Sequence, residues 1–172
     1  MAAVFVLLSA LAHLLVLLNW KTYLADIEKG INRARWYEYA ISSSIMICSI
    51  AILFGCYDLG SLILMFMINA SMNFFGLLME KMNPPERSSV DWSPFVFGSI
   101  AGLGPWIVVV MYFIGGGNFD QIPGFVYGIL VGYFIFFNTF PINMCVMHVC
   151  LKLCVVVNRQ PGLVSRWLDA AC

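Results

Sequence analysis

The chain has 172 residues, of which 62% are hydrophobic and 10% are charged, and its mean hydropathy is +0.90. Because a soluble domain carries roughly a quarter charged residues, this composition indicates a membrane protein, and the length fits one domain. The formal net charge is zero, so no basic or acidic excess points to nucleic acid. The six cysteines do not suggest a disulfide framework.

Five apolar runs predict an all-α fold, a polytopic membrane bundle of about five transmembrane helices. A helix needs about 20 apolar residues to cross a hydrocarbon core of about 30 Å, and each run approaches or exceeds that length. Short connections separate most of the runs, so neighbouring helices are expected to be antiparallel. The runs are residues 2–18, 36–56, 59–79, 94–114 and 124–150.

The basic residues predict the orientation of this multi-pass protein. Four fall in the first connection, two in the third and three after the fifth run, whereas the second and fourth connections carry none. The positive-inside rule therefore puts the amino terminus outside and the carboxyl terminus in the cytoplasm. The first run lacks the basic start of a signal peptide, so we expect a genuine span, which a further span would precede in a longer protein. The nine basic residues are Lys21, Lys29, Arg33, Arg35, Lys81, Arg87, Lys152, Arg159 and Arg166.

The second run carries polar residues at helical spacing. Arg35, Glu38 and Ser42, with Ser49 further along, fall on one stripe of a helix. A charge at the bilayer centre costs about 2.5 to 3.5 kcal/mol, so this stripe is expected to face protein or water. Two interpretations remain open: an interfacial salt bridge between Arg35 and Glu38, or a functional carboxylate.

Two other runs also carry polar stripes. Ser9 and His13 are four residues apart in the first run, where the histidine is either a functional group or a neutral imidazole bonded to a neighbouring helix. The third run places amides and small residues on one face, which favours helix packing. That stripe consists of Asn69, Asn73, Gly76 and Glu80.

The last two runs contain aromatic residues and cysteines. Trp106 in the fourth run and Phe137 with Asn138 in the fifth are typical of residues that enclose a flat apolar ligand, although most such residues simply pack. Near the end of the fifth run, one histidine and three cysteines do not share a helix face, so no metal site is predicted. They are Cys145, His148, Cys150 and Cys154.

Several long motifs, in order, resemble the heliorhodopsins, the inverted-topology relatives of microbial rhodopsins. They are RWYEYAISSS, YDLGSLILMFMINASMNFFGLLMEKMN, VDWSPFVFGSIAGLGPWIV and IPGFVYGILVGYFIFFNTFPINM. The likeness covers about residues 5–144, and residues 145–172 form a divergent tail of the same membrane domain. The family has seven helices, and the resemblance identifies the five runs here with its second to sixth.

The resemblance also implies a light-sensing function and roles for individual residues. Glu38 matches the family's counterion to a protonated retinal Schiff base, and Arg35 the arginine one turn before it. The polar network beside the chromophore would include Arg35, His13, Ser9 and Ser42. A retinal pocket would draw on Asn73, Trp106, Phe137 and Asn138.

The chain departs from the family at the lysine that binds retinal. Family members carry it in the seventh helix, and none of the four lysines here is predicted at mid-membrane. We therefore expect an incomplete chain, whether a fragment, a gene-model error or a degenerate copy, that binds no retinal alone. The four lysines are Lys21, Lys29, Lys81 and Lys152.

Three functions are compatible with the sequence, and none of them is enzymatic. The first is an incomplete light-sensing retinal protein. The second is a small transporter or channel subunit whose Arg35, Glu38 and His13 line a polar path. The third is a non-catalytic membrane partner, which would meet the lipid bilayer, further copies of itself or other membrane helices.

Overall fold

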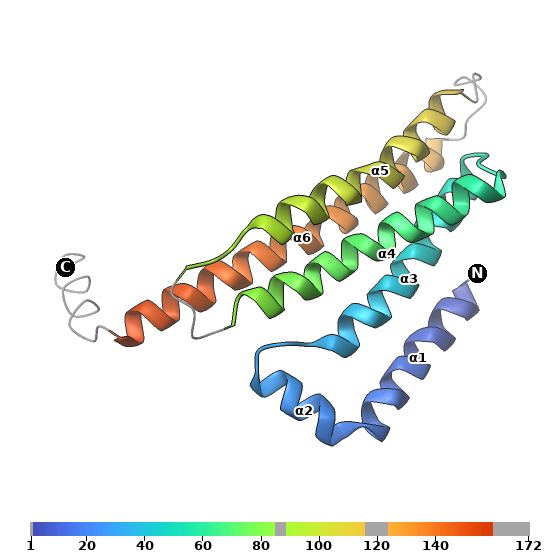
Figure 1. Ribbon diagram of the computed structural model, residues 1–172. Coiled ribbons are helices and arrows are strands. Elements are labelled where there is room, and N and C mark those ends of the chain that lie inside the picture. Colours follow the sequence, from blue (N-terminus) through green and yellow to red (C-terminus); the bar gives the residue numbers. More distant parts are fainter. Residues whose placement is uncertain (1, 85–88, 116–123, 160–172) are drawn as a thin grey trace. The chain divides into compact units, whose positions relative to one another are not determined.

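The computed structural model describes the backbone of residues 2–84, 89–115 and 124–159, and the side chains of residues 6–84, 89–115 and 124–150. These residues form six helices and no strand (Figure 1), which confirms the predicted all-α fold. Two compact units are present, one containing α1 to α5 and the other containing α6. The helices are α1 (Ala2–Leu18), α2 (Trp20–Glu28), α3 (Arg33–Leu53), α4 (Leu59–Met82), α5 (Ser93–Gly115) and α6 (Gly124–Arg159).

Four of the five predicted spans are helices long and apolar enough to cross a membrane. They are Arg33–Leu53, Leu59–Met82, Ser93–Gly115 and Gly124–Cys150. The remaining predicted span is α1, whose 17 residues rise about 25 Å and so nearly match the hydrocarbon core. A fifth candidate arises when Val6–Leu18 is joined to α2, from which it is bent by 86°. The protein is thus an integral, multi-pass membrane protein.

The connection between the first two predicted spans contains a helix that the sequence did not predict. This helix, α2, ends in a Schellman motif. Gly30 has φ +73°, a conformation that favours glycine; its N–H donates to the Ile27 carbonyl, and the Ile31 N–H donates to the Asp26 carbonyl. The chain then turns into α3, whose first turn is capped by the Asn32 side chain, which accepts from the Arg35 N–H.

Helices α3, α4 and α5 pack side by side, and α1 lies along α3 (Figure 1). Glycines permit the close approach. A Cβ at Gly76 of α4 would lie 2.0 Å from a ring atom of Trp36 on α3, and one at Gly102 of α5 would lie 2.6 Å from the sulfur of Met72. Small residues at such contacts are typical of membrane helices.

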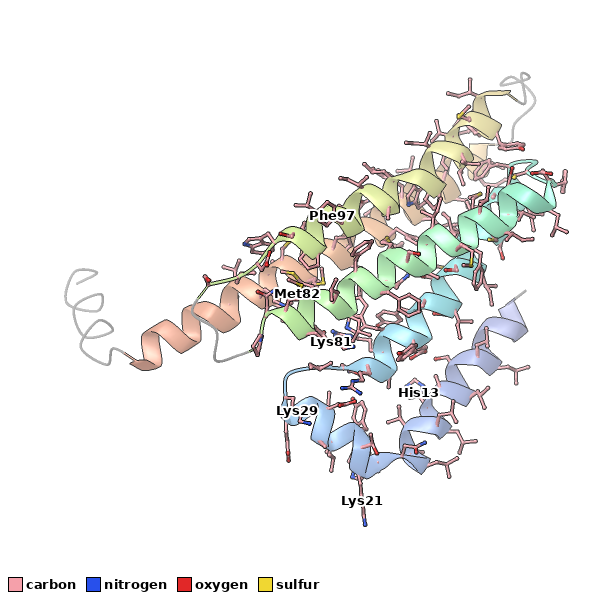
Figure 2. The ribbon with its side chains drawn as sticks, viewed as in Figure 1. His13, Lys21, Lys29, Lys81, Met82 and Phe97 are labelled. Carbon is pink, nitrogen blue, oxygen red and sulfur yellow. The ribbon has the colours of Figure 1, made fainter. Side chains whose placement is uncertain are left out.

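Large apolar side chains on the outer faces of the spans are exposed. Phe97 of α5 is 58% exposed (Figure 2), and Leu64 and Met67 of α4 are similarly open. In water such a surface would be an aggregation hazard, whereas in a bilayer it meets acyl chains. The interior of the first unit, by contrast, contains several polar side chains, and these form the candidate site.

Candidate functional site

The carboxylate of Glu38 lies where α1 meets α3. Ser9 of α1 donates a hydrogen bond from Oγ to Glu38 Oε1 over 3.1 Å. One turn along α1, His13 Nδ1 lies 2.7 Å from the Ser9 carbonyl oxygen (Figure 2). Within the described residues Glu38 has no ion pair with a lysine or arginine. A carboxylate with a hydroxyl donor and no cation is suited to receive a positive group.

The salt-bridge interpretation required Arg35 to pair with Glu38, and Arg35 does not do so. Its guanidinium binds the carboxylate of Glu80, at the end of α4, and lies 5.1 Å from the centre of the Trp36 ring. The second Glu80 oxygen accepts from the Asn32 N–H at 2.8 Å. Glu80 thus joins the last turn of α4 to the first turn of α3 and is 4% exposed, whereas its spacing in the sequence predicted only a packing role.

The amides of α4 form the packing contacts expected of them. Asn69 donates from Nδ2 to Ser43 Oγ at 2.8 Å and to Ser44 Oγ at 3.1 Å. Asn73 donates to the same Ser43 oxygen at 3.0 Å and to the Asn69 carbonyl at 2.9 Å. Ser42 is buried nearby on α3. This cluster, from here on the serine–asparagine clamp, holds α3 against α4 through hydrogen bonds inside the membrane.

A groove of about 320 Å³ lies between α1, α2 and α3, and Glu38 lines it. Most of its wall is apolar. Two carboxylates, Glu38 and Asp26, contribute to the lining, and no lysine or arginine does. Asp26 also meets Arg33, with 3.5 Å between Oδ2 and Nε. The remaining lining residues are Leu8, Leu11, Ala12, Leu15, Val16, Asn19, Thr22, Tyr23, Ala34, Tyr37 and Ile41.

The residues assigned to a retinal pocket fall into both units. Asn73 and Trp106 lie on α4 and α5 of the first unit, where both are buried. Phe137 and Asn138 lie on α6, where Asn138 is exposed and donates to the Phe134 carbonyl of its own helix at 2.8 Å. Their role as a pocket stays a prediction.

Three of the four lysines lie at helix ends. Lys21 is in the first turn of α2, Lys29 caps the end of that helix, and Lys81 is in the last turn of α4 (Figure 2). All three are exposed. Lys152 follows the candidate span Gly124–Cys150, and its side chain lies outside the described residues. No group of three or more metal-binding side chains occurs in the part of the chain that the structure describes.

Comparison with known proteins supports one family. The family model of the heliorhodopsins matches residues 1–151, and so includes residues 145–151, beyond the point at which the motifs ended. No curated protein matches the chain.

Proposed function

The chain belongs to the heliorhodopsin family, and on that premise we propose that it provides the counterion side of a light-sensing retinal site, with Glu38 as the counterion. Retinal, when bound through a protonated imine, supplies light absorption and a buried positive charge. Such a cation deprotonates in a dry site unless an anion stabilises it. Glu38 can meet that need because its carboxylate has a hydroxyl donor and no cation among the described residues.

The pairing of Arg35 with Glu80 is the observation that carries this proposal. If Arg35 neutralised Glu38, the carboxylate would have little charge to offer a second cation. Glu80 binds Arg35 instead, and the Asn32 N–H fixes the other oxygen of Glu80. In this proposal Ser9, His13 and Ser42 form the polar surroundings of Glu38, and Arg35 helps to order its helix.

The amine is the component that we propose the 172-residue chain lacks. Lys21, Lys29 and Lys81 lie at helix ends, and Lys152 follows the last candidate span. Expressed with all-trans-retinal, this chain should develop no red-shifted absorption band, and borohydride reduction should leave no retinal on the protein. A visible band would contradict the proposal, and Lys152→Ala would then be the first variant to test.

A fusion tests the role of Glu38 directly. Adding a heliorhodopsin first helix and a lysine-bearing seventh helix should produce colour. Glu38→Gln in that fusion should shift the band to the red, because a nearby anion stabilises the imine charge more in the ground state than in the excited state. Glu80→Gln is the matched control and should shift the band less. A larger shift for Glu80→Gln would make Glu80 the counterion.

We also propose the orientation that the basic residues predict, with the amino terminus outside. In a background without the natural cysteines, an impermeant thiol reagent added to intact cells should label Tyr57→Cys, which lies between α3 and α4. It should not label Ser89→Cys, which precedes α5. The reverse pattern would invert the proposed topology.

A further inference from the structure

The helix α2 exposes an apolar stripe. Trp20, Leu24 and Ile27 follow one another at four and three residues, which places them on one face, and they are 49%, 41% and 42% exposed. A second face carries Tyr23 and Asp26, which line the groove beside α3. No residue of α2 is buried against the part of the chain that the structure describes, so packing among those residues does not account for the stripe.

The bend between α1 and α2 limits where this stripe can lie. With α1 crossing the bilayer, a bend of 86° turns α2 nearly parallel to the membrane plane. α2 itself cannot continue the span, because Lys21, Asp26 and Glu28 are charged residues within nine. Because α2 begins where α1 leaves the bilayer, α2 lies at the boundary between headgroups and acyl chains.

We infer that α2 is an interfacial anchor whose stripe of Trp20, Leu24 and Ile27 is seated in the lipid of the leaflet where α1 ends. An amphipathic helix in this position buries its apolar face about 5–10 Å into the headgroup and acyl boundary. The ring centres of Trp20 and Tyr23 are 5.8 Å apart, and both residue types prefer that boundary. Lipid is the occupant because α2 directly follows α1, a membrane span whose large apolar side chains, such as Leu14 and Leu18, are also exposed.

The charges of α2 predict which lipids it needs. Over residues 20–29, Lys21 and Lys29 are balanced by Asp26 and Glu28, so the net charge is zero. Binding therefore depends on apolar burial rather than on attraction to anionic headgroups, and a zwitterionic bilayer suffices. Anionic lipid and added salt should change the depth of α2 little.

The anchor also bears on the groove beside Glu38. Tyr23 and Asp26 belong to the same short helix as the stripe, and Asp26 pairs with Arg33 at the start of α3. The position of α2 in the lipid therefore determines where one wall of the groove lies. This consequence holds whether or not the chain forms a pigment.

Nitroxide labels on the full chain in phosphatidylcholine vesicles test the inference. In a background without the natural cysteines, Leu24→Cys and Ile27→Cys place labels on the stripe. Ala25→Cys and Glu28→Cys are matched controls on a third, exposed face. The labels at 24 and 27 should relax strongly with oxygen and weakly with a water-soluble nickel chelate, and those at 25 and 28 should show the reverse.

Three other outcomes would overturn the inference. Strong relaxation of all four labels by the nickel chelate would show that α2 lies in water. Protection of 24 and 27 from both reagents, with spin coupling between chains, would mean that a second copy covers the stripe. A large increase in depth when phosphatidylglycerol is added would show that charge, rather than the apolar stripe, seats the helix.

Discussion

The two faces of α3 differ in how firmly they are held. Toward α4, the serine–asparagine clamp, the Glu80 carboxylate and the contact between Gly76 and Trp36 join residues 35–44 of α3 to residues 69–80 of α4. Toward α1, a side-chain hydrogen bond runs from Ser9 to Glu38, and a groove of about 320 Å³ lies alongside.

This difference separates the contacts that hold α3 in place from Glu38, the counterion that we propose. A helix that carries a counterion must be held in one position, since a misplaced carboxylate stabilises a cation less well. The contacts with α4 fix α3 without using Glu38. The face toward α1 keeps the carboxylate reachable, because few contacts compete for it. Substitutions on the α4 side should therefore affect stability more than those on the α1 side.

The largest effect is expected for Gly76→Ala. The new Cβ would lie 2.0 and 2.2 Å from two atoms of the Trp36 ring, and Trp36 is 1% exposed, so a shift of the ring would disturb its neighbours. We expect a loss of about 3 kcal/mol in the free energy of unfolding. Gly104→Ala is the control, since its nearest neighbour, Ile68 Cγ2, is 3.6 Å away. Thermal unfolding in detergent, followed by circular dichroism, should separate the two; equal midpoints would contradict the tight contact.

Glu80→Gln should have the next largest effect. It leaves the Arg35 guanidinium without its anionic partner and weakens the bond from the Asn32 N–H. Hydrogen bonds to charged groups contribute about 1.5–3 kcal/mol, and the partial exposure of Arg35 places the loss toward the lower end. The exposed Glu28→Gln is the control. If both variants unfolded at the same denaturant concentration, Glu80 would not hold the two helices together.

Ser9→Ala tests the face of α3 that contacts α1, where fewer contacts hold the helix. Losing the hydrogen bond to Glu38 should lower the free energy of unfolding by about 1 kcal/mol or less. Amide hydrogen exchange in α1 should rise, while that in α4 stays unchanged. Ser99→Ala, whose hydroxyl bonds the Phe95 carbonyl of its own helix, should leave both rates alone. Faster exchange in α4 after Ser9→Ala would show that the two faces of α3 are coupled.

The smallest effect concerns the turn from α3 to α4. Hydrogen bonds from Ser61, from its side chain and then from its backbone N–H, lower the pKa of Asp58 from its ordinary value of 3.8. A carboxyl whose pKa is lowered on folding stabilises the fold above its unfolded pKa, and this contribution is lost as the pH falls through the folded pKa. Asp58→Asn should thus unfold slightly more easily than the parent at pH 6, and the difference should shrink toward pH 3. A constant difference would exclude this titration.

Much of the fold follows from local sequence patterns. Hydrophobic runs of span length predicted the membrane class, and the four complete spans begin and end within a few residues of those runs, apart from α6, which continues to Arg159. The motifs identified the family, which the match over residues 1–151 confirms. Helical periodicity also placed Asn69, Asn73 and Gly76 on one face of α4, where the structure shows them packing. These features depend on residues close together in the chain, so a single sequence determines them.

The tertiary structure decided which groups meet. Periodicity placed Glu38 one turn from Arg35 and so allowed them to pair, but the register between α3 and α4 brings Glu80, 45 residues away, to the guanidinium. The sequence did not predict the helix α2 because its nine residues are too few and too charged for an apolar run, and no apolar run indicated its bend from α1. Which carboxylate pairs with Arg35 depends on the distances between helices. The spacing of residues along one helix does not determine those distances.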